Sequence, residues 1–110
     1  MEKASVDGMK LTVEIVRYVD DHQPGWVESQ FLDAQGKRHT FRDKVPGFTA
    51  IHLGPDSEYP QPGQVCCRVL SQTQDALGRT LVHISTAYPY DIESIEGLSE
   101  FNVLPTQLSN

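Results

Sequence analysis

A five-residue turn signature occurs twice in this chain, at residues 33–37 (Asp-Ala-Gln-Gly-Lys) and at residues 75–79 (Asp-Ala-Leu-Gly-Arg). Asp commonly opens a type I turn, and Gly adopts the left-handed conformation that closes a three-residue hairpin loop. The signature therefore predicts two β-hairpins, in each of which the first residue of the signature pairs with the fifth. This constrains the fold more than any other feature, because it sets the register of both hairpins.

The register of the first hairpin divides its side chains between two faces. The face that we expect to point toward the core carries Val27, Ser29, Phe31, His39, Phe41, Asp43 and Val45. On the opposite face, Glu28 lies across from Arg42 as an ion pair, and Trp26 lies across from Lys44 as a cation–π contact. We expect this second face to be a solvated surface whose charges neutralise one another.

The second hairpin is ambiguous, because both of its faces are partly apolar. In the predicted register, one face carries Leu70, Val82 and Ile84, and the other carries Val65, Cys67 and Val69. Such a hairpin either lies in the centre of the structure or changes face at a β-bulge. The sequence leaves both alternatives open.

The remaining segments predict an all-β fold. Apolar residues alternate with polar ones from Met9 to Tyr18, which indicates a half-buried strand. Residues 46–63 contain many Pro and Gly and leave room for one helical turn at 49–53, and Pro105 ends a last short strand. We therefore predict a small antiparallel β-barrel of five to seven strands in residues 9–105, with a flexible leader (1–8) and a flexible tail (106–110).

Charge and cysteine content indicate a cytoplasmic protein. The net charge of −6 argues against general affinity for nucleic acid, although residues 36–80 carry six basic and four acidic side chains. No apolar run could span a membrane, and the first ten residues do not read as a secretory signal. Cys66 and Cys67 are adjacent and would point to opposite faces of a strand, so we expect two reduced, packed thiols; a redox role is the alternative.

No motif predicts catalysis, a metal site or a cofactor. The histidines have no His or Cys at the local spacing of zinc ligands, the glycines are dispersed, and no nucleophile elbow is present. His39 and Asp43 share a predicted face and could act as an acid–base pair in a loop pocket. We rank an enzyme of this kind third among the possible functions.

Six residues are candidate contacts for a partner, namely Trp26, Arg42, Lys44, Tyr59, Tyr88 and Tyr90. Aromatic side chains on Pro-rich loops are typical contact residues, although they also close the ends of small barrels. The function we favour is a non-catalytic binding or accessory module that contacts a protein partner or a second copy of itself. The alternative is a barrel for single-stranded nucleic acid, because Arg42 and Lys44 lie on a basic strand near Trp26; Glu28 and the net charge argue against it.

Five short strings carry a resemblance to known proteins; they lie at residues 13–18, 21–28, 43–46, 59–63 and 92–94. They resemble a group of small bacterial all-β proteins that have no assigned function. The resemblance covers most of residues 10–104 and consists mainly of turn and core residues. It implies a fold but no activity, ligand or catalytic residue.

Overall fold

A computed structural model describes residues 8–110; most of the expected leader therefore lies outside the described residues. The described chain forms seven β-strands and two single 3-10 turns, η1 and η2. The strands are β1 (Met9–Asp20), β2 (Trp26–Leu32), β3 (Arg38–Lys44), β4 (Gln61–Gln74), β5 (Thr80–Ser85), β6 (Glu100–Val103) and β7 (Leu108–Ser109), and the turns are η1 (Val45–Gly47) and η2 (Pro105–Gln107). Among residues 8–110, no helix is long and apolar enough to cross a membrane.

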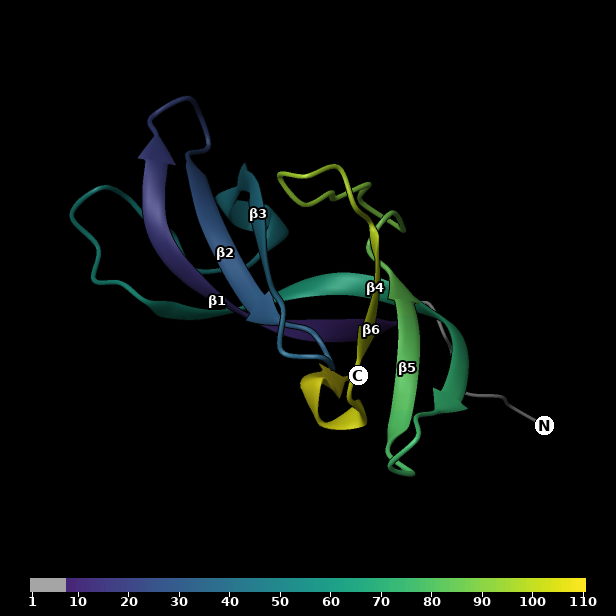
Figure 1. The fold of residues 1–110 in the computed structure, drawn as a ribbon. Coiled ribbons are helices and arrows are strands. Elements are labelled where there is room, and N and C mark those ends of the chain that lie inside the picture. The colour runs from purple at the N-terminus through teal and green to yellow at the C-terminus, as the bar shows by residue number, and fades with distance from the viewer. Residues whose placement is uncertain (1–7) are drawn as a thin grey trace.

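The strands form one antiparallel sheet in the order β3-β2-β1-β4-β5-β6, and the short β7 pairs with β1. Figure 1 shows that this sheet curls into a half-barrel, with β1, β2 and β3 on one side and β5 and β6 on the other. The long strand β4 joins the two sides, because its first half pairs with β1 and its second half with β5. The predicted all-β barrel class is confirmed.

Loop contacts close much of the gap between the edge strands β3 and β6. The backbone N–H of Ile95 donates to the carbonyl of Thr40 (2.8 Å), and Ser94 forms a β-bridge with Phe41. The N–H of Ala34, in the first hairpin turn, donates to the carbonyl of Asn102 in β6 (2.8 Å). These bonds satisfy backbone groups that an open sheet edge would leave exposed.

The first hairpin has the predicted register along its whole length. Trp26 pairs with Lys44, Glu28 with Arg42, and Phe31 with His39. The face predicted to point inward is buried except at Asp43, which is half-buried. The turn glycine has the positive φ that the prediction requires, +84° at Gly36.

A β-bulge resolves the ambiguity of the second hairpin. The predicted register holds from Gln74–Thr80 to Ser71–His83 and then shifts by one residue, so that Ile84 pairs with Val69 rather than with Leu70. Leu70 is therefore exposed, and the core receives Val65 and Cys67 from β4. Apolar residues occupy both predicted faces because the strand changes face at the bulge.

The connecting segment after β3 and the C-terminal residues add short elements to the sheet. The sequence leaves room for a helical turn at 49–53, but the helical turn of this region is η1, which begins four residues earlier. Pro46 accounts for the shift, since the fixed φ of proline suits the first position of a helical turn. Residues 106–110, the expected tail, contain β7, in which Leu108 pairs with Leu11.

Aromatic rings fill the centre of the barrel. Phe41 is fully buried and lies 5.7 Å from Phe31 and 5.8 Å from Phe101 between ring centroids. The Phe101 ring is perpendicular to both of the others, the edge-to-face arrangement that aromatic side chains prefer. The ring of Phe48, which lines a surface groove, lies 6.4 Å from that of Phe41, so the interior packs against this groove.

Candidate ligand-binding groove

A groove of about 550 Å³ lies where β1, the end of β3 and β4 meet two loops. Two lysines come from strands: Lys10 from β1 and Lys44 from the end of β3. The lining also includes the thiol-bearing Cys66 of β4 and the phenol-bearing Tyr90. The buried side chains of Phe48 and Ile92 make part of the lining apolar.

Hydrogen bonds to backbone carbonyls hold both loops of the groove in place. The N–H of Gln64 in β4 donates to the carbonyl of Phe48 (2.9 Å), which fixes the segment after η1. On the other side, the buried hydroxyl of Thr86 donates to the carbonyl of Ile92 (2.6 Å), whose own N–H donates to the carbonyl of Thr86 (3.0 Å). The loop that carries Tyr90 is thus anchored at both ends, while Tyr90 itself is 65% exposed.

The groove is locally positive although the chain is acidic. Among the described residues, no carboxylate forms an ion pair with the ammonium of Lys10 or Lys44. The carboxylate of Asp43 also lines the groove, where it accepts a hydrogen bond from the backbone N–H of Lys44 (2.7 Å). The Lys44 ammonium lies 5.9 Å from the centroid of the Trp26 ring, which confirms the predicted cation–π contact.

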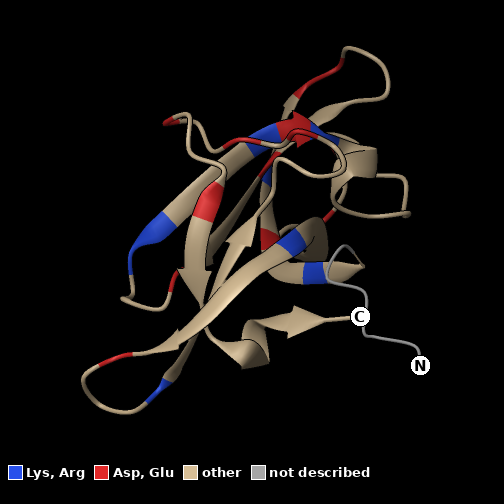
Figure 2. Cartoon of the chain, turned by 90° about the vertical axis from the view of Figure 1, so that its right-hand side faces the viewer, with Lys and Arg blue, Asp and Glu red and all other residues tan. Residues whose placement is uncertain are grey.

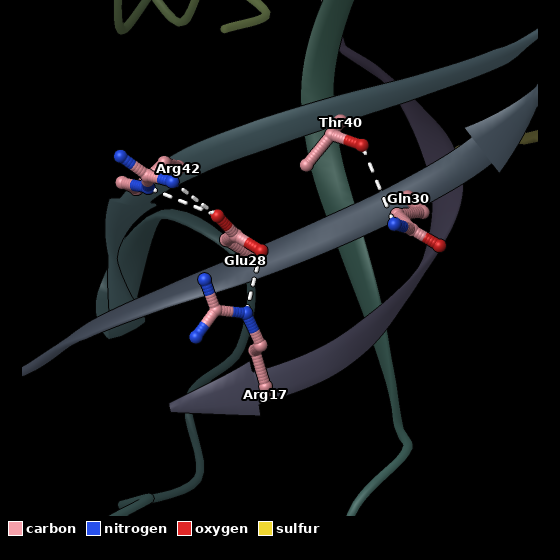
Figure 3. Close-up of polar contacts among 5 residues, drawn as sticks. All are labelled: Arg17, Glu28, Gln30, Thr40 and Arg42. Carbon is pink, nitrogen blue, oxygen red and sulfur yellow. Dashed lines mark hydrogen bonds and ion pairs between the residues drawn. The ribbon is translucent and has the colours of Figure 1, made fainter. Parts of the chain in front are cut away.

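Beside the groove, Glu28 is clamped between two arginines. Figure 3 shows its carboxylate between Arg17 of β1 and Arg42 of β3, with Oε1 accepting from Arg17 Nε (2.8 Å) and Oε2 accepting from Arg42 Nε (3.0 Å). Burial raises the pKa of the Glu28 carboxyl, but the hydrogen bonds from Arg42 and Arg17 outweigh burial and hold the pKa below its ordinary value. The predicted ion pair with Arg42 is present, and Arg17 is a third member that the sequence did not reveal.

Two of the six predicted contact residues line the groove, and a third contacts one of these two. Lys44 and Tyr90 line the groove, and Trp26 packs under Lys44. Arg42 is engaged with Glu28. Tyr59 is half-buried and donates its hydroxyl to the carbonyl of Gly54 (2.7 Å).

Tyr88 lies two residues before Tyr90 on the same loop and is 52% exposed. The Arg68 guanidinium lies 4.2 Å from the centroid of its ring. Tyr88 therefore makes a cation–π contact with β4 rather than lining the groove.

The proposed pairing of His39 with Asp43 is wrong, because His39 binds a different carboxylate. His39 Nε2 lies 2.7 Å from Asp33 Oδ2, and the His39 side chain is buried between Phe31 and Phe101. Hydrogen bonds from the backbone N–H groups of residues 35 and 37 also reach this carboxylate. Burial raises the pKa of the Asp33 carboxyl, but the hydrogen bonds from His39 and these N–H groups keep it below the ordinary value.

The two thiols differ in exposure. Cys66 is half-buried at the groove, whereas Cys67 is fully buried in the core. Burial is the main cause that raises the pKa of Cys67, to about 11, so this thiol is protonated at neutral pH. Both cysteines are free in the structure.

Sequence reasoning missed Lys10 as a groove residue. Its alternation with Leu11 on β1 indicates that it points away from the core. Alternation does not indicate the groove, because the other lining residues are more than thirty residues away in the chain. Arg17 was missed because a register shift between Ile15 and Arg17 places it, rather than Val16, opposite Glu28. A strict alternation from the start of the strand cannot reveal that shift.

Comparison with known proteins yields no relative: no family model matches the chain, and neither a curated protein nor a solved structure is significantly similar. The described residues also contain no group of three His, Cys, Asp or Glu side chains positioned to hold a metal ion. The groove offers two ammonium groups, an exposed phenol and an apolar lining. Ammonium groups attract anions, and a phenol hydroxyl donates and accepts hydrogen bonds.

Proposed function

We propose that the protein is a non-catalytic binding module whose groove holds an acidic segment of a protein partner. One observation carries the proposal: Lys10 and Lys44 both line a groove whose lining also includes Phe48, Ile92 and the exposed Tyr90. Ammonium groups attract carboxylates, and an exposed tyrosine beside apolar side chains is a typical anchor for a partner. We call this surface the lysine groove.

Charge complementarity supports an acidic segment over a basic or neutral one. The chain as a whole carries −6, so it repels acidic ligands everywhere except at local positive sites. Neither groove lysine is neutralised by a described ion pair, whereas Arg42 and Arg79 are each bound to a carboxylate. An acidic segment would therefore be directed to the lysine groove.

Single-stranded nucleic acid is the second candidate, favoured by the cation–π pair of Lys44 and Trp26 on the outer face of β2 and β3. Two observations weigh against it. Glu28 binds the neighbouring Arg42, and Figure 2 shows basic segments interspersed with acidic ones in the view drawn. Strands that bind phosphates need a continuous positive track.

Fluorescence anisotropy with a labelled hexaglutamate peptide tests the proposal. We expect saturable binding to the wild-type protein that weakens with added salt, and a loss of about tenfold or more in affinity in the Lys10→Ala/Lys44→Ala double variant. Lys37→Ala is the matched control, since Lys37 is exposed in the first hairpin turn, outside the groove, and its removal should leave the affinity unchanged.

A second titration uses a labelled ten-residue oligothymidine. Binding of the oligothymidine without binding of hexaglutamate would overturn the proposal in favour of the nucleic-acid alternative. Equal loss of hexaglutamate affinity in Lys37→Ala and in the double variant would also overturn it, because the attraction would then be a property of the whole surface. Circular dichroism of each variant verifies that the fold is retained.

A further inference from the structure

A second groove, of about 650 Å³, is lined, like the lysine groove, by residues of β1 and β4. It is bordered by residues 12–14 of β1, by the end of β2, by the start of β4 and by η2. Its lining includes Thr12, Glu14, Gln30, Leu32, Pro62 and Gln107. Among the described residues that line it, Glu14 alone is charged, so we call it the glutamate groove.

The register of β1 and β4 places the two grooves next to each other. Lys10 pairs with Cys66, and both line the lysine groove. Two residues further along β1, Thr12 of the glutamate groove pairs with Gln64 of the lysine groove. The grooves therefore meet at the Thr12–Gln64 pair, and no other strand separates them.

The junction is polar and uncharged. Gln64 is exposed, and its side-chain Nε2 donates a long hydrogen bond (3.3 Å) to Ser109 Oγ of β7. Thr12 is exposed beside it. A chain that crosses this junction would meet hydroxyl and amide groups rather than a charge or an apolar side chain.

The charges at the two ends of this surface are opposite. Lys10 lies at one end and Glu14 at the other, four residues apart on β1, which is about 13 Å along a strand. Glu14 is exposed, and no described cation forms an ion pair with it. An extended ligand with carboxylates at one end and a cation about four residues away would match both ends.

We infer that the two grooves form one site for an extended partner segment whose acidic end lies in the lysine groove and whose basic end lies at Glu14. This inference rests on the proposed function and adds the chemistry of the partner's second end. The continuity of the two linings and their opposite charges carry it.

Three labelled heptapeptides of identical composition test the inference. Two have blocks of charge, Glu-Glu-Ser-Gln-Ser-Lys-Lys and its reversed sequence, because the chain direction of the ligand is not set by the charges alone. The third alternates the Glu and Lys residues. We expect one block peptide to bind the wild-type protein about fivefold or more tightly than the alternating peptide.

In the Glu14→Lys variant, that block peptide should bind no more tightly than the alternating peptide. Binding of hexaglutamate should not weaken, because hexaglutamate uses the lysine groove alone. Glu96→Lys makes the same charge change at an exposed position outside both grooves and should keep the advantage. The two substitutions therefore separate a local charge contact from a change in net charge.

The outcomes distinguish the inference from the proposed function. If hexaglutamate binds but no block peptide has an advantage, or if Glu14→Lys preserves the advantage, the inference is overturned and the lysine groove stands. If hexaglutamate does not bind the wild-type protein, both the proposed function and the inference fall.

Discussion

The guanidinium of Arg79 donates a hydrogen bond of 3.1 Å to the carbonyl oxygen of Ala34, which is 45 residues earlier in the chain. Arg79 ends the second Asp-Ala-x-Gly turn, and Ala34 lies in the first. The same guanidinium also binds Asp75 of its own turn (2.7 Å from Nε to Oδ2). The two repeated turns thus set hairpin registers locally and also contact each other in the folded barrel.

The same Asp→Ala substitution should lower the free energy of unfolding by different amounts in the two turns. Asp33 and Asp75 each accept two backbone N–H groups of their turn, but Asp33 is bound to the buried His39, whereas Asp75 is bound to the half-exposed Arg79. Asp33→Ala should lower the free energy of unfolding by about 2 kcal/mol, because it leaves a buried imidazole nitrogen without a partner. Asp75→Ala should cost clearly less. Urea denaturation of both variants checks this order, and equal costs would show that His39 adds nothing to the turn.

A side chain at either turn glycine should destabilise the protein. Gly36 and Gly78 have φ of +84° and +82°, although a Cβ would meet nothing within 4 Å at either position. Gly→Ala at each position should therefore destabilise the protein by about 1 kcal/mol through backbone strain alone. Gly54→Ala is the control, because that site is equally open and lacks a positive φ. Thermal denaturation measures the stability of the three variants. Equal stabilities would show that backbone strain at the two turn glycines is not the cause.

The clamped Glu28 predicts a pH dependence of stability. Its pKa is lowered in the folded state, so its contribution is present above the unfolded pKa and is lost as the pH falls through the folded pKa. Glu28→Gln should cost about 1–2 kcal/mol at pH 7 and should flatten the decline in stability below about pH 5. Some decline should persist, because Asp20, Asp33 and Asp75 also have lowered pKa values.

Urea denaturation of wild type and Glu28→Gln at several pH values between 7 and 3 measures this dependence. The free-energy difference between the two proteins should shrink as the pH falls. A constant difference would show that the carboxylate contributes through packing rather than through its charge.

The two thiols should react at very different rates. Cys66 lies half-buried at the lysine groove, and Cys67 is buried with a raised pKa. An alkylating reagent at pH 8 should therefore modify one thiol in the folded protein and the second only on unfolding. Mass spectrometry of Cys66→Ser, which should show no rapid modification, identifies the reactive residue. Rapid alkylation of Cys67 would contradict the packing of this strand.

Local sequence signals predicted the parts of the fold that depend on neighbouring residues. The Asp-Ala-x-Gly turns gave the full register of the first hairpin, and hence the Glu28–Arg42 and Trp26–Lys44 pairs. The register of the second hairpin failed beyond Ser71, because a bulge depends on how the strand joins two sides of the barrel rather than on its own residues.

The candidate site was predictable only in part, since its members come together through the curl of the sheet. Lys44 and Tyr90 were identified by residue type, but nothing in the sequence indicates that they share a groove with Lys10. His39 was expected to pair with Asp43 on its own strand, and it pairs instead with Asp33 across the hairpin. Side-chain partners of this kind depend on rotamers and twist, which alternation patterns do not contain.

A nitrogen–proton NMR titration with hexaglutamate shows whether the lysine groove binds an acidic segment. We expect concentration-dependent shifts of the backbone amides of Lys10, Lys44, Cys66 and Tyr90, with little change in the second hairpin turn at residues 75–79. Binding in the groove would be ruled out if the largest shifts lay outside it, or if no amide shifted at millimolar peptide.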